Sequence, residues 1–304
     1  IAVVGPFANE KNIIGAWCCL GRAEDAVSVI EGIEKYLGMH VKSAKGCSAD
    51  LLSEDFSDIN ETETVAAEAD VVIVCIGEKS CDSGEGASRA KLEITKPQAE
   101  LVKTMKKSGK KVVCVVFGGR PQVLTEIEPY SDAILYVWQP GTEGGTAIAR
   151  VLYGEINPSG KLTMSFPRAT GQCPIYYNSY STGRPRNPDT LKNCRYNSAY
   201  IDCLNAPLYP FGFGLGYTAF ELSEMRLSAD KFQRGDVIEV SVKIKNIGER
   251  SGEEVVQLYI RDLFASYVRP IKVLKGYKKV FLQPLEEKEI KFTIDEKTLK
   301  FYTA

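Results

Sequence analysis

The residues best suited to chemistry lie in one segment, residues 77–92, with the sequence GEKSCDSGEGASRAKL. It directly follows ADVVIVCI, a short β-branched apolar run bounded by a glycine. Such a run predicts a buried parallel strand, and the Gly- and Ser-rich residues after it predict a loop at the strand's carboxyl end. Ligands of open α/β sheets bind at this edge. The loop carries four ionisable candidates, namely Glu78, Asp82, Glu85 and Arg89.

Glu85 stands out among them because it lies between Gly84 and Gly86. Glycine adopts positive φ angles without steric cost, so a carboxylate between two glycines can be held at an unusual backbone angle and approached closely. Glu85 is therefore the first candidate for proton transfer. From this loop alone, the alternative is an ordinary solvated acidic loop.

Other kinds of site have weaker support. Three glycine turns, at residues 5–6, 118–120 and 141–145, match neither GxGxxG nor GxxxxGK[ST], so they predict tight βα turns and no nucleotide cofactor. The single histidine, His40, has no partner at triad or metal-ligand spacing, and we expect a structural role and no metal. A nucleophilic Cys81 would lack a histidine to raise its thiolate fraction.

Composition narrows the class of protein. The chain has 304 residues, which suits two domains, and its formal charge of −1 argues against nucleic acid as a partner. It contains no apolar run of about 18 residues, so no membrane span is expected. The nine cysteines form no CxxC pair and favour reduced thiols in a cytoplasmic setting, with a secreted or periplasmic one left open.

Short apolar runs alternate with helical patterns up to about residue 162. This alternation predicts an α/β domain with a doubly wound, mostly parallel sheet and helices on both faces. Pro97 suits the first turn of one helix and Gly109 its C-terminal cap. The expected strands cover residues 1–5, 39–46, 69–76, 111–119 and 133–141, and the expected helices cover 25–38, 61–69, 96–109, 121–128 and 144–154.

The pattern then changes twice. Residues 167–210 are rich in Pro, Asn, Tyr, Ser and Arg, which predicts a long connecting segment, with Tyr176, Tyr177, Arg184 and Arg186 as its docking side chains. Beyond residue 217, period-two runs at 237–246, 253–262, 271–282 and 288–294 predict a fibronectin- or immunoglobulin-like β-sandwich of five or six strands. We therefore divide the chain into residues 1–166, 167–216 and 217–304.

Several stretches in order along the chain carry a family resemblance: IAVVGPFA, GAW, SGEGASRAKL, PQAELV, WQPGTEGGTAIARVLYGEINPSGKLTMSFP, GQCPIYYN and YPFGFGLGYTAF. Together they resemble the C-terminal two-thirds of glycoside hydrolase family 3, the family of many bacterial β-glucosidases. The resemblance implies that a TIM-like barrel, which carries the aspartate nucleophile in that family, is missing from this chain. It also implies that the last strand or strands of the fibronectin-like domain are missing, as expected for a piece of a longer protein.

Carried over by position, the glutamate of SGEGxSR is Glu85, which the resemblance makes the general acid/base, with Glu78 as runner-up. The residues implied to shape and orient its loop are Ser83, Gly84, Gly86, Ser88 and Arg89. A retaining glycosidase needs a nucleophilic carboxylate and a proton-donating carboxyl group about 5–5.5 Å apart. This chain would supply only the second of these.

The resemblance thus implies a β-glucoside substrate, the missing barrel as partner and no cofactor. The oligomeric state stays open, with a homodimer among the options. A different class is the alternative: a non-catalytic carbohydrate-binding or interaction protein. An enzyme part needs Glu85 at a loop tip that faces a partner, whereas a binding domain needs a closed pocket with aromatic walls. A flavodoxin-like, nucleotide-using enzyme is a third and weaker reading.

Overall fold

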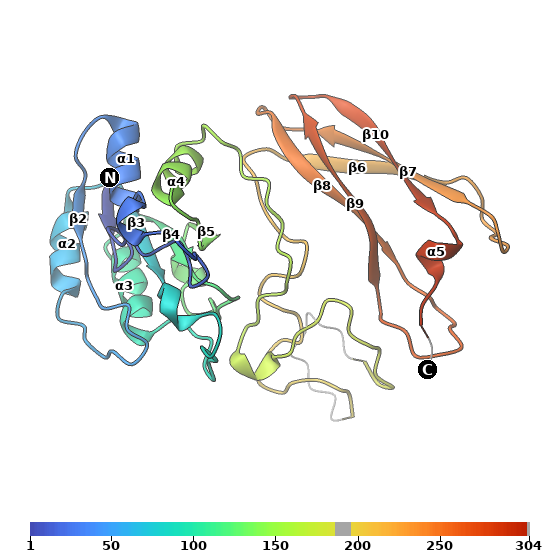
Figure 1. Cartoon of the computed structure of the whole chain (residues 1–304), viewed down its shortest axis with the longest axis horizontal. Coiled ribbons are helices and arrows are strands. Elements are labelled where there is room, and N and C mark those ends of the chain that lie inside the picture. The colour runs from blue at the N-terminus through green and yellow to red at the C-terminus, as the bar shows by residue number, and fades with distance from the viewer. Residues whose placement is uncertain (186–195, 303–304) are drawn as a thin grey trace.

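The computed structural model describes residues 1–185 and 196–302. Figure 1 shows two bodies, an α/β part that carries the N-terminus and an all-β part that carries the C-terminus. Arg186, one of the expected docking side chains, lies outside the described residues. The elements of the first part are β1 (Ala2–Val4), α1 (Val29–Leu37), β2 (Lys42–Ala44), α2 (Ile59–Ala67), β3 (Val71–Gly77), α3 (Lys96–Lys107), β4 (Lys111–Phe117), β5 (Ala133–Trp138) and α4 (Gly144–Leu152).

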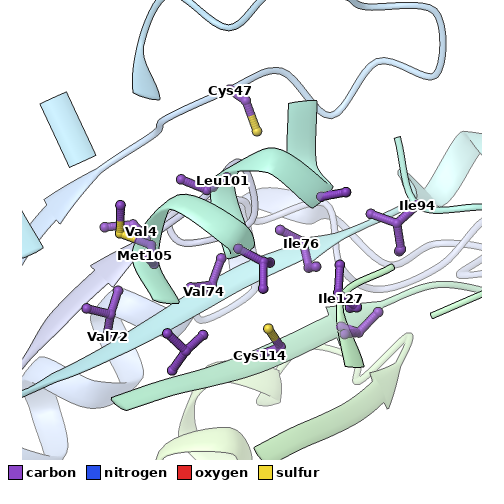
Figure 2. Packing of buried hydrophobic residues seen from close by; sticks show 14 of the residues in the cluster. Val4, Cys47, Val72, Val74, Ile76, Ile94, Leu101, Met105, Cys114 and Ile127 are labelled. Carbon is purple, nitrogen blue, oxygen red and sulfur yellow. The ribbon is translucent and has the colours of Figure 1, made fainter. Parts of the chain in front are cut away.

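The five strands form one parallel sheet in the order β2-β1-β3-β4-β5. Both faces of β3 are buried, as its continuous apolar sequence predicts. Val72, Val74 and Ile76 belong to a core that includes residues of α2 and α3, and Figure 2 shows α3 lying over this face of the sheet. Ile73 and Cys75 point to the other face, into a core with residues of α1 and α4. The predicted doubly wound sheet with helices on both faces is therefore confirmed.

Local signals place the ends of α3 where the sequence predicts them, whereas α1 begins at Val29, four residues after its expected start. Pro97 lies in the first turn of α3, and Gly109 follows its last turn with a φ of 78°. At α1, Ser28 and Glu31 form a capping box, and Gly38 ends the helix in the left-handed region. These caps satisfy backbone groups that would otherwise lack partners at the helix termini.

The helix expected over residues 121–128 is wrong. Only a short 3-10 turn, Glu128–Tyr130, forms near its end. Val123 instead pairs with Glu93 in a parallel bridge, and its N–H donates to the Leu92 carbonyl at 2.9 Å. Because this backbone bonds to a distant segment, it cannot also make the local i to i−4 bonds of a helix. The α/β part also contains three short 3-10 helices, η1 (Ala23–Asp25), η2 (Ser80–Asp82) and η3 (Glu128–Tyr130). A fourth, η4 (Thr170–Gln172), lies in the connecting segment.

The second part is a two-sheet sandwich around a small core that includes Val240, Ile244, Val256, Leu282 and Phe292. One sheet has the order β10-β7-β6 and the other pairs β8 with β9. Five strands among the described residues agree with the predicted five or six. The elements are β6 (Phe220–Leu227), β7 (Ile238–Asn246), β8 (Gly252–Ile260), β9 (Val273–Leu282), β10 (Glu287–Ile294) and the short α5 (Glu296–Leu299).

Strand β6 was not predicted from the sequence. Its pairing with β7 shifts register between Ser223 and Arg226, and Glu224 within this interval has a φ of 49°. Such a bulge interrupts the period-two alternation by which strands are recognised. Leu222 and Leu227 of this strand are also more than half exposed, so burial does not restore the pattern.

The connecting segment packs against both bodies. Phe166 and Tyr209 pair in an antiparallel bridge, so the chain leaves the α/β part and returns beside its own path. Tyr177 stacks on Phe211 with ring centroids 4.2 Å apart, and its hydroxyl accepts a hydrogen bond from the Leu274 N–H at 3.4 Å. Tyr177 thus joins the segment to the sandwich. Lys161 adds a partly buried ion pair with Glu254 of β8 at 2.9 Å.

Candidate functional site

The site is built on the carboxyl end of β3. There the fully buried side chain of Gln98, from α3, makes two hydrogen bonds to the backbone of Gly77. Its Oε1 accepts from the Gly77 N–H at 2.6 Å, and its Nε2 donates to the Gly77 carbonyl at 3.0 Å. Gly77 has a φ of 141°, and a Cβ there would lie 2.0 Å from the Phe117 carbonyl oxygen. The glycine is required because β4 comes this close. Residues 77–93, which follow this anchor, are called the Glu85 loop below.

Glu78 is buried at the start of the Glu85 loop. Its side chain has no exposed surface and lies between two guanidinium groups, with Arg89 Nη1 2.8 Å from Oε2 and Arg120 Nε 3.2 Å from Oε1. The Gly119 N–H donates to Oε1 as well, at 3.0 Å. A buried carboxylate is tolerated when charged partners and hydrogen bonds compensate for the lost water, and here both are present. The geometry suits an anchor and leaves little room for proton exchange with a substrate.

Glu85 has the opposite environment. It is exposed, and its carboxylate makes no hydrogen bond or ion pair with any described residue. Gly84 and Gly86 hold it from either side with φ angles of 108° and 73°. The Ala87 N–H donates to the Gly84 carbonyl at 3.3 Å, so residues 84–87 form a turn with Glu85 near its apex. We call residues 84–86 the tip and the rest of the Glu85 loop the stem.

The other predicted loop residues divide between stem and surface. Ser83 is buried and its hydroxyl accepts from Gln139 Nε2 at 3.0 Å. Arg89 has its second hydrogen bond to the Glu93 carbonyl, at 3.1 Å. Ser88 is exposed. The structure therefore brings Ser83, Glu78 and Arg89 together beneath the tip and leaves Ser88 outside this network.

Arg120 follows β4, the strand next to β3, and Gln139 follows β5, the strand beyond β4; both bind the stem, and sequence reasoning missed both. The sequence Gly118-Gly119-Arg120 predicts a tight turn, which would also suit a neutral, hydroxyl-rich ligand, and does not indicate a contact with the Glu85 loop. The glycines are needed for approach, because a Cβ at Gly119 would lie 2.2 Å from Ser83 Oγ. The available signal was topological: this turn ends a strand adjacent to β3, so it meets the Glu85 loop at the same sheet edge.

The far end of the stem is tied to the connecting segment. The Glu93 carboxylate accepts from the Thr170 hydroxyl at 2.9 Å and from the Thr170 N–H at 3.3 Å, and the Leu92 N–H donates to the same hydroxyl oxygen at 2.9 Å. Partial burial of Glu93 favours its neutral form, but the hydrogen bonds from backbone N–H groups and from Thr170 outweigh burial and hold the pKa below its ordinary value.

An exposed apolar surface lies beside the tip. Ala16 and Trp17 are so close to Gly84 that a Cβ there would lie 3.0 Å from the Ala16 Cβ and 3.2 Å from Trp17 Nε1. The Trp17 side chain is nevertheless 68% exposed, and Leu20 in the same loop is 97% exposed. An exposed tryptophan beside this loop suits a surface that another domain or a ligand covers. An exposed carboxyl group at this position can exchange a proton with a group brought against this surface.

Two grooves in the part of the chain that the structure describes lie away from this edge. One groove lies at the junction of the two bodies, around Gly154, Asn157 and Arg250. The other opens between the sheets of the sandwich, beside Leu222, Met225 and Val256. Neither is lined by the Glu85 loop. The same described residues contain no cluster of three or more metal-ligating side chains.

The state of the cysteines and the character of the helices are relevant to the cellular compartment and to membrane association. Each of the eight cysteines within the described ranges has a free thiol. Burial raises the pKa of Cys47 to about 12 and that of Cys114 to about 12, so both behave as core residues. Of the helices in the described ranges, none has the length and apolar character that crossing a bilayer would require.

Sequence comparison identifies both parts of the chain. Residues 1–217 match the model of the glycosyl hydrolase family 3 C-terminal domain, and residues 254–304 match that of the fibronectin type III-like domain. A periplasmic beta-glucosidase of Salmonella typhimurium is 41% identical over 99% of this chain and 42% of its own length. A beta-xylosidase of Formosa agariphila is 37% identical over 97% of this chain and 40% of its own length.

Solved structures agree. A mutant beta-glucosidase from Listeria innocua in complex with laminaribiose superposes with a TM-score of 0.93 at 40% identity, over 99% of this chain and 41% of that one. The chain thus spans about two-fifths of the length of the relatives that it matches. The expected cytoplasmic setting finds no support among them, since the Salmonella relative is named as periplasmic.

Proposed function

This chain belongs to glycoside hydrolase family 3, and from that premise we propose that it supplies Glu85 as the general acid/base of a retaining β-glycosidase. The observation that carries the proposal is the position of Glu85: an exposed, unpaired carboxylate at a glycine-flanked tip, on a stem braced by buried ion pairs. A general acid must come within hydrogen-bond reach of the leaving oxygen, and an exposed tip allows this.

The nucleophile in this proposal is an aspartate on an N-terminal barrel that docks over the tip. The described residues form no barrel, and the exposed Trp17 beside Gly84 suits a surface that the barrel and the sugar cover. In this scheme Glu85 first donates its proton to the glycosidic oxygen and then, as carboxylate, takes a proton from the attacking water. Residues 1–166 act as the acid/base domain, 167–216 as the docking segment and 217–304 as its β-sandwich support.

We favour terminal β-D-glucosides as substrates because beta-glucosidases are prominent among the relatives, with β-D-xylosides as the alternative that the Formosa relative raises. Glu78 is the less favoured acid/base, since its side chain is buried between Arg89 and Arg120. The alternative is a non-catalytic carbohydrate-binding protein, which requires a closed pocket with aromatic walls, whereas the acid/base role requires Glu85 on an exposed tip. A homodimer is the proposed alternative to a monomer, and light scattering distinguishes them.

The test measures hydrolysis of 4-nitrophenyl β-D-glucoside and β-D-xyloside by the full-length enzyme that contains this chain. Glu85→Ala should lower turnover by about 10²- to 10⁴-fold, the usual contribution of a general acid/base. Azide, which needs no general base, should restore turnover and yield the β-glycosyl azide. The matched control is Glu54→Ala, which removes another exposed carboxylate of the same domain and should leave turnover unchanged. Full activity of the Glu85→Ala enzyme would overturn the assignment and bring Glu78 forward.

A further inference from the structure

Arg120 closes the neck of the Glu85 loop. Its Nη2 donates to two carbonyl oxygens, that of Asp82 at 2.5 Å and that of Ala87 at 2.7 Å. Asp82 lies three residues before Glu85 and Ala87 two residues after it. One nitrogen atom therefore holds together the two strands of chain that lead into and out of the tip.

The guanidinium is itself fixed in place. Its Nε binds the buried Glu78 carboxylate at 3.2 Å, and only 19% of the Arg120 side chain is exposed. The Arg120 carbonyl accepts from the Tyr136 hydroxyl at 2.5 Å, and that hydroxyl accepts from Gln122 Nε2 at 3.1 Å. Tyr136 belongs to β5 and Arg120 follows β4, so the clamp connects the Glu85 loop to the two strands beyond β3.

The tip has no comparable support of its own. It contains two glycines with positive φ, and Glu85 makes no hydrogen bond or ion pair with the described residues that would fix its direction. Glycine leaves the backbone free to adopt many conformations, so the position of the tip depends on how its two ends are held. Displacement of a catalytic group by about 1 Å can cost about 10²-fold in rate.

We propose that Arg120 is a positioning residue for Glu85, a role that rests on the proposed function of Glu85 as the acid/base. Arg120 acts by clamping the Asp82 and Ala87 carbonyls while its Nε stays on Glu78. A lysine can keep the charge beside Glu78 but lacks the planar fork that reaches the carboxylate and both carbonyls from one rigid group. Arg120 thus sets the distance from the Glu85 carboxyl group to the leaving oxygen.

The test uses the dependence on the leaving group in the full-length enzyme. Phenyl β-D-glucoside needs protonation of its leaving oxygen, whereas 2,4-dinitrophenyl β-D-glucoside releases a stable phenolate that does not. Arg120→Ala should lower kcat/KM for the phenyl glucoside by about 10²-fold and that for the dinitrophenyl glucoside only a few-fold. Arg120→Lys, which keeps a positive charge for Glu78, should fold if Arg120→Ala does not and should show the same preference.

A purely structural role would give a different result, because loss of folded enzyme lowers both kcat/KM values by the same factor. Equal losses for the two substrates in the Arg120→Lys enzyme would overturn the inference. The control is Lys161→Met, which removes another partly buried ion pair, that with Glu254, far along the chain from the loop. It should leave the ratio of the two kcat/KM values unchanged.

Glu85→Ala separates this inference from the proposed function. If Glu85→Ala itself shows no dependence on the leaving group, the acid/base assignment fails, and the inference fails with it. If Glu85→Ala shows the dependence and neither Arg120 variant does, the positioning role alone is overturned. In the Glu85→Ala enzyme, adding Arg120→Ala should bring little further loss on the phenyl glucoside, since there is no carboxyl group left to position.

Discussion

The stem and the tip of the Glu85 loop differ in almost every physical respect, although they are separated by only a few residues. The stem contains a fully buried carboxylate, two guanidinium groups and a buried serine, all with partners at hydrogen-bond distance. The tip contains two positive-φ glycines and an exposed glutamate without a partner among the described residues. The two glutamates, Glu78 and Glu85, thus have the same chemistry in opposite environments.

If Glu85 is the acid/base, as we propose, the contrast shows how an active site can be divided between two folded parts. A carboxyl group that must meet a substrate on another domain has to stay accessible, and this prevents it from being held by its own neighbours. The rigidity must then come from the residues below, whose charges can be fully paired because they never contact the substrate. In the proposed assignment, Glu78 holds the stem in place while Glu85 stays accessible to the substrate.

The largest expected effect tests the contrast between the two glutamates. Glu78→Gln leaves Arg89 and Arg120 without their shared counter-charge in a mostly buried site, which should cost about 3–5 kcal/mol of unfolding free energy. Glu85→Gln removes an exposed, unpaired charge and should change it by less than about 0.5 kcal/mol. Urea unfolding followed by tryptophan fluorescence measures both. Similar costs for the two variants would show that the stem and the tip do not differ as described.

The two glycines of the tip provide the next test. An alanine at Gly84 would adopt a φ of 108° and contact Ala16 and Trp17, which should cost about 1–3 kcal/mol. Gly86→Asn should cost at most about 1 kcal/mol, because a φ of 73° is accessible to asparagine and a Cβ there has no neighbour within 4 Å. Thermal unfolding compares them. A larger loss at Gly86 than at Gly84 would contradict this account of the tip.

Low pH should weaken the hydrogen bonds between Glu93 and Thr170 at the far end of the stem. The folded-state pKa of Glu93 lies below the ordinary value of 4.5, so its contribution to stability is complete above pH 4.5 and is lost as the pH falls through the folded-state pKa. Glu93→Gln should therefore cost about 1 kcal/mol at pH 7 and progressively less below pH 4.5. Unfolding free energies at pH 7, 5 and 3 measure this. A difference that grows towards low pH would be the wrong sign.

Thiol labelling gives the smallest effect on stability and separates the outer surface of the stem from the core. Cys81 is exposed, whereas burial raises the pKa values of Cys47 and Cys114 to about 12. At pH 8, a disulfide reagent should label Cys81 in the folded protein and reach Cys47 and Cys114 only after unfolding. Cys19 and Cys173 are exposed as well, so Cys81→Ser should lower the amplitude of fast labelling by one thiol and change stability by less than about 0.5 kcal/mol. An unchanged amplitude of fast labelling in Cys81→Ser would contradict the exposed position of Cys81.

Much of the fold could be predicted because it follows from local patterns. Continuous β-branched runs indicate strands buried on both faces, and Pro97 and Gly109 mark the ends of a helix. The predictions of secondary structure failed where contacts with residues far away in the sequence determine the backbone conformation. Residues 121–128 have helical periodicity, yet Val123 pairs with Glu93, and strand β6 loses its alternation at a bulge against β7.

The sequence by itself determined the family, the two kinds of domain and the carboxylate between two glycines at a strand end, because each depends on residue types at short spacing. Only the tertiary structure decided that Glu78 is buried, that Arg120 reaches it from the next strand, and that Thr170 holds Glu93 from 77 residues away. Charges far apart in sequence meet only when strand order and close glycine contacts bring them together. No local pattern contains that information.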